Sequence, residues 1–127
     1  MNYHQAIKNY KDNDILSQVE GGSKHDFIKI ILTELSHNLK ILSHAIENEP
    51  KTSKNKSNSL GRIIASLTIL MNSLDFKKGE QIASNLFNLY DYCKRVVLDD
   101  YRNLKTDGIA SAIQVIDDIL SAWVQIK

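Results

Sequence analysis

The spacing of apolar residues most constrains the fold of this chain. In four stretches, large apolar side chains recur at alternating intervals of three and four residues, and no stretch shows sustained alternation of apolar and polar residues. The first spacing places side chains on one face of an α-helix, whereas alternation would be typical of a half-buried strand. One proline and five glycines in 127 residues leave few positions that interrupt a helix. The sequence therefore predicts an all-α fold.

Helix-breaking residues divide the chain into an N-terminal segment and four helices. Gly21 and Gly22 end the first segment, and polar stretches follow at 48–59, 75–79 and 102–108. We expect helices at about 23–47, 59–74 and 78–101, and a fourth from an Asp107 cap. Ser23 followed by Asp26 predicts a capping box. The length of 127 residues predicts a single domain over 1–127. Because the connections are short, we expect an antiparallel up-down four-helix bundle (23–127) with a short helical segment (1–22) packed on it.

Each predicted helix has one apolar stripe that we expect to face the core. The four stripes are Ile28, Leu32, Leu35, Leu39, Leu42 and Ile46; Leu60, Ile64, Leu67, Met71 and Leu74; Ile82, Leu86, Leu89, Cys93 and Val96; and Ile109, Ile113, Ile116, Leu120 and Trp123. Three helices have further apolar residues beside the stripe: Ile63, Ile69 and Leu70; Phe87, Tyr90, Val97 and Tyr101; and Val115, Ile119 and Ile126. Two interpretations stay open: a wide core-facing stripe, or an exposed apolar groove for a partner helix.

The N-terminal segment has the pattern of a short amphipathic helix. Tyr3, Ala6, Ile7 and Tyr10 stand at i, i+3, i+4 and i+7. A helix this short is marginal alone and needs a surface to dock on. We expect either a fixed fifth element or a lid that a partner displaces.

Residues that carry chemistry are sparse. The chain has no glycine-rich phosphate loop, no Gly-x-Ser-x-Gly elbow and no Cys-x-x-Cys pair. Glu34 and His37 match the Glu-x-x-His of di-iron bundles, but they lie off the core stripe and no second pair exists. We therefore expect no catalytic residue, no metal and no other cofactor, and a protein that is not an enzyme.

One histidine motif leaves a second hypothesis open. His37 and Lys40 resemble the His-x-x-Lys of histidine phosphotransfer bundles, but Ile41 and Leu42 follow where those domains have glycine or another small residue. Phosphotransfer on His37 is thus the weaker alternative. His25 and His44 are expected at the surface, and Trp123 in the core near the end of its helix. Cys93 is expected to be a buried apolar residue.

Charge and hydropathy limit the classes of partner and the cellular compartment that the sequence predicts. Sixteen basic residues against fifteen acidic ones give a net charge of +1, so no global field attracts nucleic acid or an anionic membrane. No stretch approaches the ~20 apolar residues of a membrane span, and the first residues lack the apolar core of a secretory signal. The single cysteine suits a reducing compartment. A cytoplasmic location without membrane insertion is expected.

The stretch from Ser73 to Tyr92, SLDFKKGEQIASNLFNLYDY, closely resembles the central signature of the FliS family of flagellar secretion chaperones. That signature has Leu-Asp, a Lys-Gly-Gly-Glu-like turn, Ile-Ala, Asn-Leu and Leu-Tyr-Asp-Tyr. Ser23 to Ile28 resembles the start of the family's first helix, and Ala122-Trp123 resembles its closing motif. Glu80 stands in place of the second glycine of the turn, and Lys24 in place of a proline. The resemblance covers nearly the whole chain.

The resemblance implies a cytosolic chaperone that binds the C-terminal segment of flagellin. It would prevent premature polymerisation and keep the subunit competent for flagellar type III secretion, with the client lying as short helices in apolar grooves. The residues expected to contact the client, as groove or as lid, are Tyr3, Ile7, Tyr10, Leu86, Phe87, Tyr90, Val97 and Ile119. Whether export-gate components also bind, and whether the free protein is a monomer or a dimer, is left open.

Overall fold

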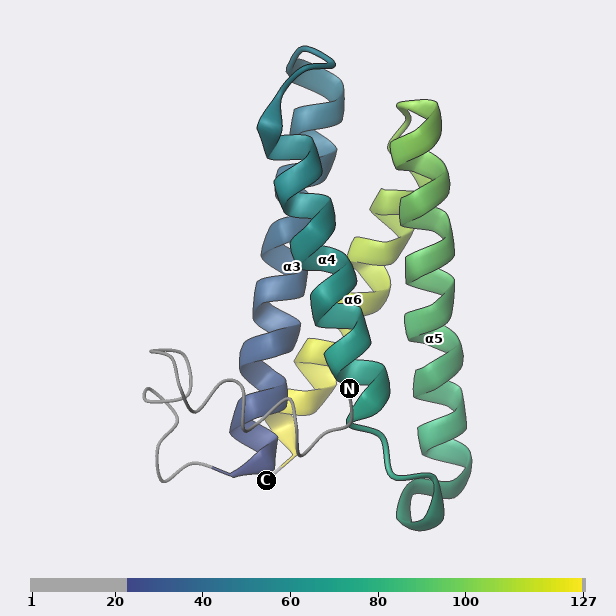
Figure 1. Ribbon diagram of the computed structural model, residues 1–127. Coiled ribbons are helices and arrows are strands. Elements are labelled where there is room, and N and C mark those ends of the chain that lie inside the picture. The colour runs from purple at the N-terminus through teal and green to yellow at the C-terminus, as the bar shows by residue number, and fades with distance from the viewer. Residues whose placement is uncertain (1–22, 127) are drawn as a thin grey trace.

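The computed structural model describes residues 23–126, which form four α-helices and, within that range, no strand. The helices are α3 (Lys24–Asn48), α4 (Lys54–Asn72), α5 (Phe76–Asn103) and α6 (Asp107–Gln125). Consecutive helices run in opposite directions, and α6 packs back on α3 (Figure 1). The all-α fold and the four helices are confirmed as predicted, whereas the expected helical segment at 1–22 lies outside the described residues.

Serine caps fix the starts of the first two helices. The Ser23 hydroxyl accepts a hydrogen bond from the Asp26 amide, and the Asp26 carboxylate accepts one from the Ser23 amide, which confirms the capping box. The Ser53 hydroxyl accepts a hydrogen bond from the Asn55 amide. Helix α4 therefore begins at Lys54 and not near Ser59 as expected. The polar stretch at 48–59 has the composition of a linker, because the residues exposed at the start of α4 are lysine, asparagine and serine.

Helix α5 begins with a short turn that is offset from the rest of the helix. The Asp75 carboxylate accepts hydrogen bonds from the amides of Lys77 and Lys78, both at 3.0 Å, so the helix starts at Phe76 and not at Lys78 as expected. Glu80 then has φ 45° and ψ −119°, which interrupts the helical geometry. The regular part of α5 therefore starts after Glu80. The positive φ is strained for a glutamate, because a side chain adds a steric cost that glycine does not have.

Helix α6 is capped by a residue of the preceding helix. The N-cap residue of α6 is Thr106, whose side chain makes no capping hydrogen bond. The expected cap at Asp107 is wrong, because Asp107 is the first residue of the helix. Instead, the buried Asp100 carboxylate accepts a hydrogen bond from the Ile109 amide at 2.8 Å. A Cβ atom on Gly108 would lie 2.9 Å from the Val96 Cβ, so only glycine permits this close approach of α6 to α5. The two helices are therefore fixed together at this end.

The core lies between the four helices, and α3 contributes the largest share of it. The largest fully buried side chains are Phe27, Ile31, Leu32, Leu35, Leu39, Leu42, Ile63, Leu67, Leu70, Ile109, Ile116 and Val97. The stripe expected on α3 is buried, apart from the half-buried Ile46. On α4 the buried set includes Ile63, Ile69 and Leu70, which lie beside the expected stripe. The wide core-facing stripe is thus the correct interpretation for α4.

A candidate partner-binding surface on α5

Exposed apolar side chains gather on the N-terminal half of α5. Phe76 is 51% exposed, Ile82 70%, Phe87 39% and Leu89 38%. We call these four residues the α5 apolar surface. The other large apolar residues that the described part of the chain exposes are Leu104 at the far end of α5 and Val124 and Ile126 at the end of α6. Exposed apolar residues grouped in this way, unlike single ones, mark interaction sites.

The edge of α5 that faces α6 becomes more exposed toward the start of the helix. Ile82, Leu89 and Val96 are seven residues apart and so lie on one edge. Val96, next to Gly108 of α6, is half-buried, whereas Leu89 is 38% and Ile82 70% exposed. The reason is the course of α6, which starts beside the C-terminal end of α5 and runs obliquely toward the N-terminal end of α3 (Figure 1). Its departure from α5 leaves Ile82 uncovered.

Ile119 lies on the side of α6 that is turned away from α3. Asp117 faces α3, where its carboxylate accepts a hydrogen bond from Ser36 and pairs with Lys40 at 3.4 Å. Two residues further, the helix has turned by about 200°, which directs the half-buried Ile119 toward the α5 side.

An aromatic pair lies on the opposite edge of α5. Phe87 is about 140° around the helix from Ile82, on the side toward α4. The first turn of α5, offset by the break at Glu80, places the Phe76 ring against Phe87 in an edge-on contact, with 6.1 Å between centroids. The two rings keep 51% and 39% exposure despite this contact. Both edges of the N-terminal half of α5 therefore present apolar surface.

The residues expected to contact a client differ in how exposed they are in the structure. Phe87 is exposed, and Leu86 and Ile119 are half-buried against the core. Tyr90 and Val97, expected on a client face, are 2% and 0% exposed, so both lie in the core. Conversely, Ile82 and Leu89, expected in the core, are exposed. Tyr3, Ile7 and Tyr10 lie outside the described residues.

These differences between the expected and observed burial correspond to a rotation of α5 about its own axis, relative to the orientation that the sequence predicts. Its buried positions are Ala83, Tyr90, Cys93, Val97 and Asp100. Both the expected and the observed stripe have helical spacing, and they differ by less than a quarter turn. The small side chain of Ala83 and the polar Asp100 gave no apolar signal, although Asp100 is buried because it caps α6.

Burial sets the ionisation of two side chains in this core. Burial raises the pKa of the Cys93 thiol from 9.0 to about 12. Burial, together with the neighbouring Cys93, raises the pKa of the Tyr90 hydroxyl from 10.0 to about 12. A thiol with so high a pKa is a poor nucleophile. Cys93 is therefore a buried apolar residue, as expected.

At the other end of α6, His25 and Trp123 hold the helix against α3. The Trp123 indole N–H donates a hydrogen bond to the His25 carbonyl at 3.0 Å, and His25 Nε2 lies 2.7 Å from the Trp123 carbonyl. The rings stack with 5.1 Å between centroids. The expectation of a surface position for His25 is thus wrong, since the residue is half-buried. Sequence spacing gave no sign of a contact between residues so far apart.

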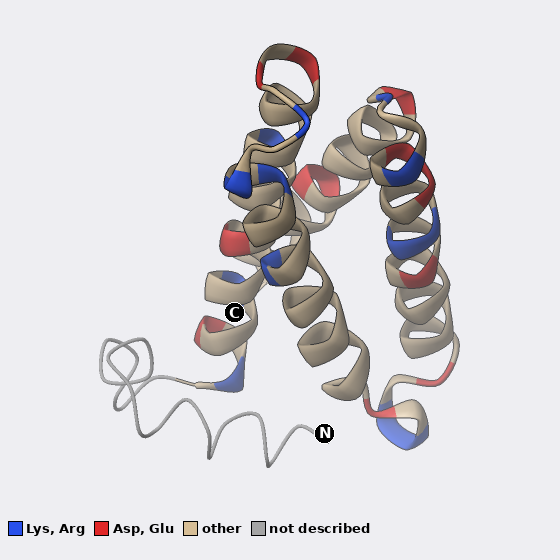
Figure 2. Cartoon of the chain, turned by 45° about the horizontal axis from the view of Figure 1, so that its top comes forward, with Lys and Arg blue, Asp and Glu red and all other residues tan. Residues whose placement is uncertain are grey.

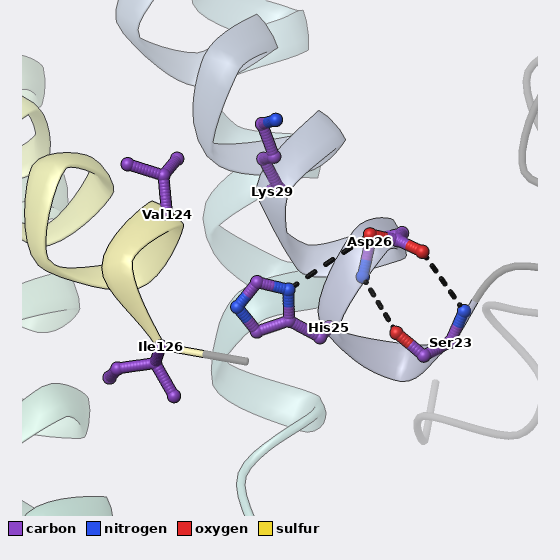
Figure 3. A pocket seen from close by; sticks show the side chains of 6 residues that line it. All are labelled: Ser23, His25, Asp26, Lys29, Val124 and Ile126. Atoms are coloured by element: carbon purple, nitrogen blue, oxygen red, sulfur yellow. Dashed lines mark hydrogen bonds and ion pairs between the residues drawn. The ribbon is translucent and has the colours of Figure 1, made fainter.

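A hollow of about 340 Å³ lies beside this contact. Its lining comes from the first turns of α3 and the last residues of α6: Ser23, His25, Asp26, Lys29, Val124 and Ile126 (Figure 3). The amide and carboxylate of Asp26 form the capping-box hydrogen bonds with Ser23, so they stabilise the start of α3.

His37 is exposed on α3, as expected. Lys40, one turn further on, pairs with Asp117 of α6, so the lysine that would balance a phosphate already has a partner. Within residues 23–126, no group of three or more histidine, cysteine, aspartate or glutamate side chains is placed to hold a metal ion. Among these residues, no helix has the length and hydropathy to cross a membrane.

A four-helix bundle with exposed apolar side chains gathered on one helix has the features of a protein-binding module. The chain matches the family model described as flagellar protein FliS over residues 4–127. It is also 31% identical over 130 residues to the flagellar secretion chaperone FliS of Salmonella typhimurium (strain LT2), in an alignment that covers 96% of this chain and 90% of the relative. The chain therefore belongs to the FliS family of flagellar secretion chaperones.

Proposed function

We propose that this protein is a cytosolic export chaperone that binds the C-terminal segment of flagellin through the N-terminal half of α5. It acts by binding alone, without catalysis, and keeps the subunit unpolymerised and competent for secretion. The observation that carries the proposal is the exposure of Ile82, Phe87 and Leu89 on one helix of a FliS family member.

The client is best accommodated as a helix. The surface of α5 consists of helical turns whose backbone groups are bonded within the helix, so it offers no free donors or acceptors to an extended peptide. An extended segment on apolar side chains would leave its own backbone groups unpaired, which is costly. A helical segment satisfies its own backbone and presents apolar side chains at intervals of three and four residues. Ile82 and Leu89, two turns or about 10.5 Å apart, match that repeat.

Leu86 and Ile119 are also proposed to contact the client, through the part of each side chain that stays exposed. Both are half-buried and pack on the core cluster; Leu86 lies on α5 between Ile82 and Leu89, and Ile119 lies on α6. Tyr90 and Val97 lie in the core, so neither is proposed to touch a client on the described surface. Tyr3, Ile7 and Tyr10 are proposed to cover the client site in the free chaperone, so removal of residues 1–22 is expected to raise the affinity for the client.

Calorimetric titration with a peptide of the last ~50 residues of the organism's own flagellin tests the proposal. We expect one-to-one binding with a large negative heat-capacity change, because a disordered client folds as it buries apolar surface. A folded protein that shows no binding would contradict the proposal.

A matched pair of variants locates the contact. Ile82→Asp puts a charge on the α5 apolar surface and is expected to weaken binding at least tenfold, since it would bury an unpaired carboxylate. Leu104→Asp removes an exposed apolar side chain at the other end of α5 and is expected to leave binding unchanged. Both residues are exposed, so thermal unfolding should stay near that of the wild type. Equal effects of the two variants would show that the site lies elsewhere.

A further inference from the structure

Two exposed apolar residues border the hollow at the junction of α3 and α6, which we call the α3–α6 hollow. Val124 is 44% and Ile126 56% exposed. Both lie on the α6 side of the hollow, opposite Ser23 and Lys29 at the start of α3 (Figure 3). The volume of about 340 Å³ is within the range of ~300–1,000 Å³ that is typical of ligand pockets. The hollow therefore has room for apolar side chains that would cover Val124 and Ile126.

A second hollow, of about 310 Å³, continues the first along α3. Its lining consists of Asp26, Lys29, Ile30, Thr33 and Glu34, so the two hollows share Asp26 and Lys29. The first turns of α3 bear charges of both signs (Figure 2), whereas residues 119–126 of α6 have none. Lys29 is exposed and forms no ion pair with another residue within 23–126. These hollows thus suit an occupant with apolar side chains next to α6 and an acidic side chain next to Lys29.

The chain that leads into α3 has both features. Residues 15–20 have the sequence ILSQVE, with apolar residues at Ile15, Leu16 and Val19 and an acidic residue at Glu20. A helical turn would bring these three apolar side chains to one side, because they stand at i, i+1 and i+4. Val19 is four residues before Ser23, so the two Cα atoms are at most about 14 Å apart. The glycines at 21 and 22 permit a reversal of the chain between them.

We propose that residues 15–20 dock in the α3–α6 hollow of their own chain, with the three apolar side chains over Val124 and Ile126 and with Glu20 near Lys29. A segment joined to Ser23 by so few residues meets the hollow at an effective concentration on the order of 1 mM. This proximity favours the segment over a second copy of the chain or a separate partner. Most of the stabilisation comes from the apolar contact, because an exposed ion pair contributes little.

The docking gives the N-terminal segment two parts with different roles. The hollow lies at the start of α3 and the end of α6, on the side of the bundle away from α5 (Figure 1). An occupant of the hollow therefore does not compete with a partner on the α5 apolar surface. Residues 15–20 act as an anchor that stays on the bundle when a partner displaces Tyr3, Ile7 and Tyr10, and the anchor keeps those residues close enough to return. The docking itself does not depend on the proposed function.

Disulfide cross-linking of the full chain tests the docking. In Gln18→Cys/Gln125→Cys the new cysteines flank the proposed contact without replacing an apolar residue. In the control, Gln18→Cys/Thr68→Cys, the second cysteine lies at an exposed position of α4. Cys93 does not compete, because it is buried and its thiol has a pKa raised to about 12. Under mild oxidation we expect the first pair to close within the chain roughly tenfold faster than the control, or more. Equal rates, or disulfides mainly between chains, would overturn the proposal.

Charge substitutions identify the contacts within the Gln18→Cys/Gln125→Cys protein. Ile126→Asp should slow closure roughly fivefold or more, because docking would bury an unpaired carboxylate. Lys29→Glu should slow it roughly twofold, and Glu20→Lys in that variant should restore the rate. Leu104→Asp, at an exposed position far from the hollow, is the control and should have no effect. An unchanged rate in Ile126→Asp would overturn the proposed contact.

The same cross-link distinguishes an anchor from a lid. With a saturating concentration of the flagellin peptide, closure of Gln18→Cys/Gln125→Cys should stay within about twofold of its rate without the peptide, because the two sites do not overlap. A tenfold slower closure would show that residues 15–20 leave the hollow when the client binds, and would overturn the anchor. Since closure is also measured without flagellin, failure of the docking and failure of the proposed function give different results.

Discussion

His25 and Trp123 bind each other through their backbone and their side chains at once. The Trp123 indole donates to the His25 carbonyl at 3.0 Å, the His25 ring donates to the Trp123 carbonyl at 2.7 Å, and the two rings stack. This reciprocal contact joins the first turn of α3 to the last turns of α6. Because the start of α6 is fixed against α5 at Gly108, the two contacts together set the oblique course of α6 that leaves Ile82 exposed.

Loss of the indole hydrogen bond should destabilise the fold. Trp123→Phe keeps a ring to stack on His25 but removes the donor to the His25 carbonyl, so we expect the free energy of unfolding to fall by about 1–2 kcal/mol. Urea denaturation followed by circular dichroism measures this. Val124→Ala, at the exposed neighbouring residue, is the control and should change stability by less than about 0.5 kcal/mol. Equal stability of Trp123→Phe and the wild type would show that the hydrogen bond contributes nothing.

The same glycine-to-alanine substitution should have opposite effects on α4 and α6. In Gly108→Ala the new methyl would lie 2.9 Å from the Val96 Cβ and 3.1 Å from the Val96 carbonyl oxygen, and we expect a loss of about 1–3 kcal/mol. Gly61 in α4 has no atom within 4 Å of an added Cβ, so Gly61→Ala should gain up to about 1 kcal/mol from helix propensity. Chemical denaturation of both variants checks the pair, and a stabilised Gly108→Ala would contradict the close packing of α5 and α6.

Glycine at position 80 should stabilise the protein. Glu80 has φ 45° and ψ −119°, a strained conformation that costs a non-glycine residue about 1–3 kcal/mol. Glycine adopts it freely, at an entropic cost of about 0.5–1 kcal/mol. We expect Glu80→Gly to raise the free energy of unfolding by about 1 kcal/mol. Gln81→Gly, one residue into the regular helix, should lower it by a similar amount, and a destabilised Glu80→Gly would argue against strain at this turn.

Stability should fall at alkaline pH because Cys93 and Tyr90 are neutral in the folded state. Their pKa values rise on folding from 9.0 and 10.0 to about 12. Below about pH 9 both groups are neutral in the folded and unfolded states, so their contribution is fully present. Between about pH 9 and 12 the unfolded chain loses these protons first, which favours unfolding by up to ~1.4 kcal/mol per pH unit and site. Urea midpoints at pH 8, 9.5 and 11 measure the decline.

Cys93→Ala serves as the comparison for the alkaline series. It removes one of the two groups, so its stability should decline less steeply between pH 9 and 12 than that of the wild type, from a lower starting value at pH 8. Parallel curves for the two proteins would show that Cys93 does not contribute to the pH dependence.

Local sequence signals are sufficient to predict the four helices, the capping box and the family. Apolar spacing, scarce helix breakers and the Ser23–Asp26 pair are local signals, because a helix satisfies its backbone within a few residues. The long motif from Ser73 to Tyr92 identified the family without reference to any contact. By contrast, the missed start of α4 at Lys54 shows that a polar helix end has no apolar signal to reveal it.

Which apolar residues lie in the core and which lie at the surface depends on contacts between helices. On α5, a stripe through Ile82 and Leu89 and a stripe through Tyr90 and Val97 have equally good helical spacing, and the choice depends on where α6 lies. That position is set by Gly108 against Val96, by Asp100 capping α6 and by Trp123 on His25. These are contacts between residues on different helices, and no local pattern encodes them, which is why the exposed Ile82 and Leu89 were expected in the core.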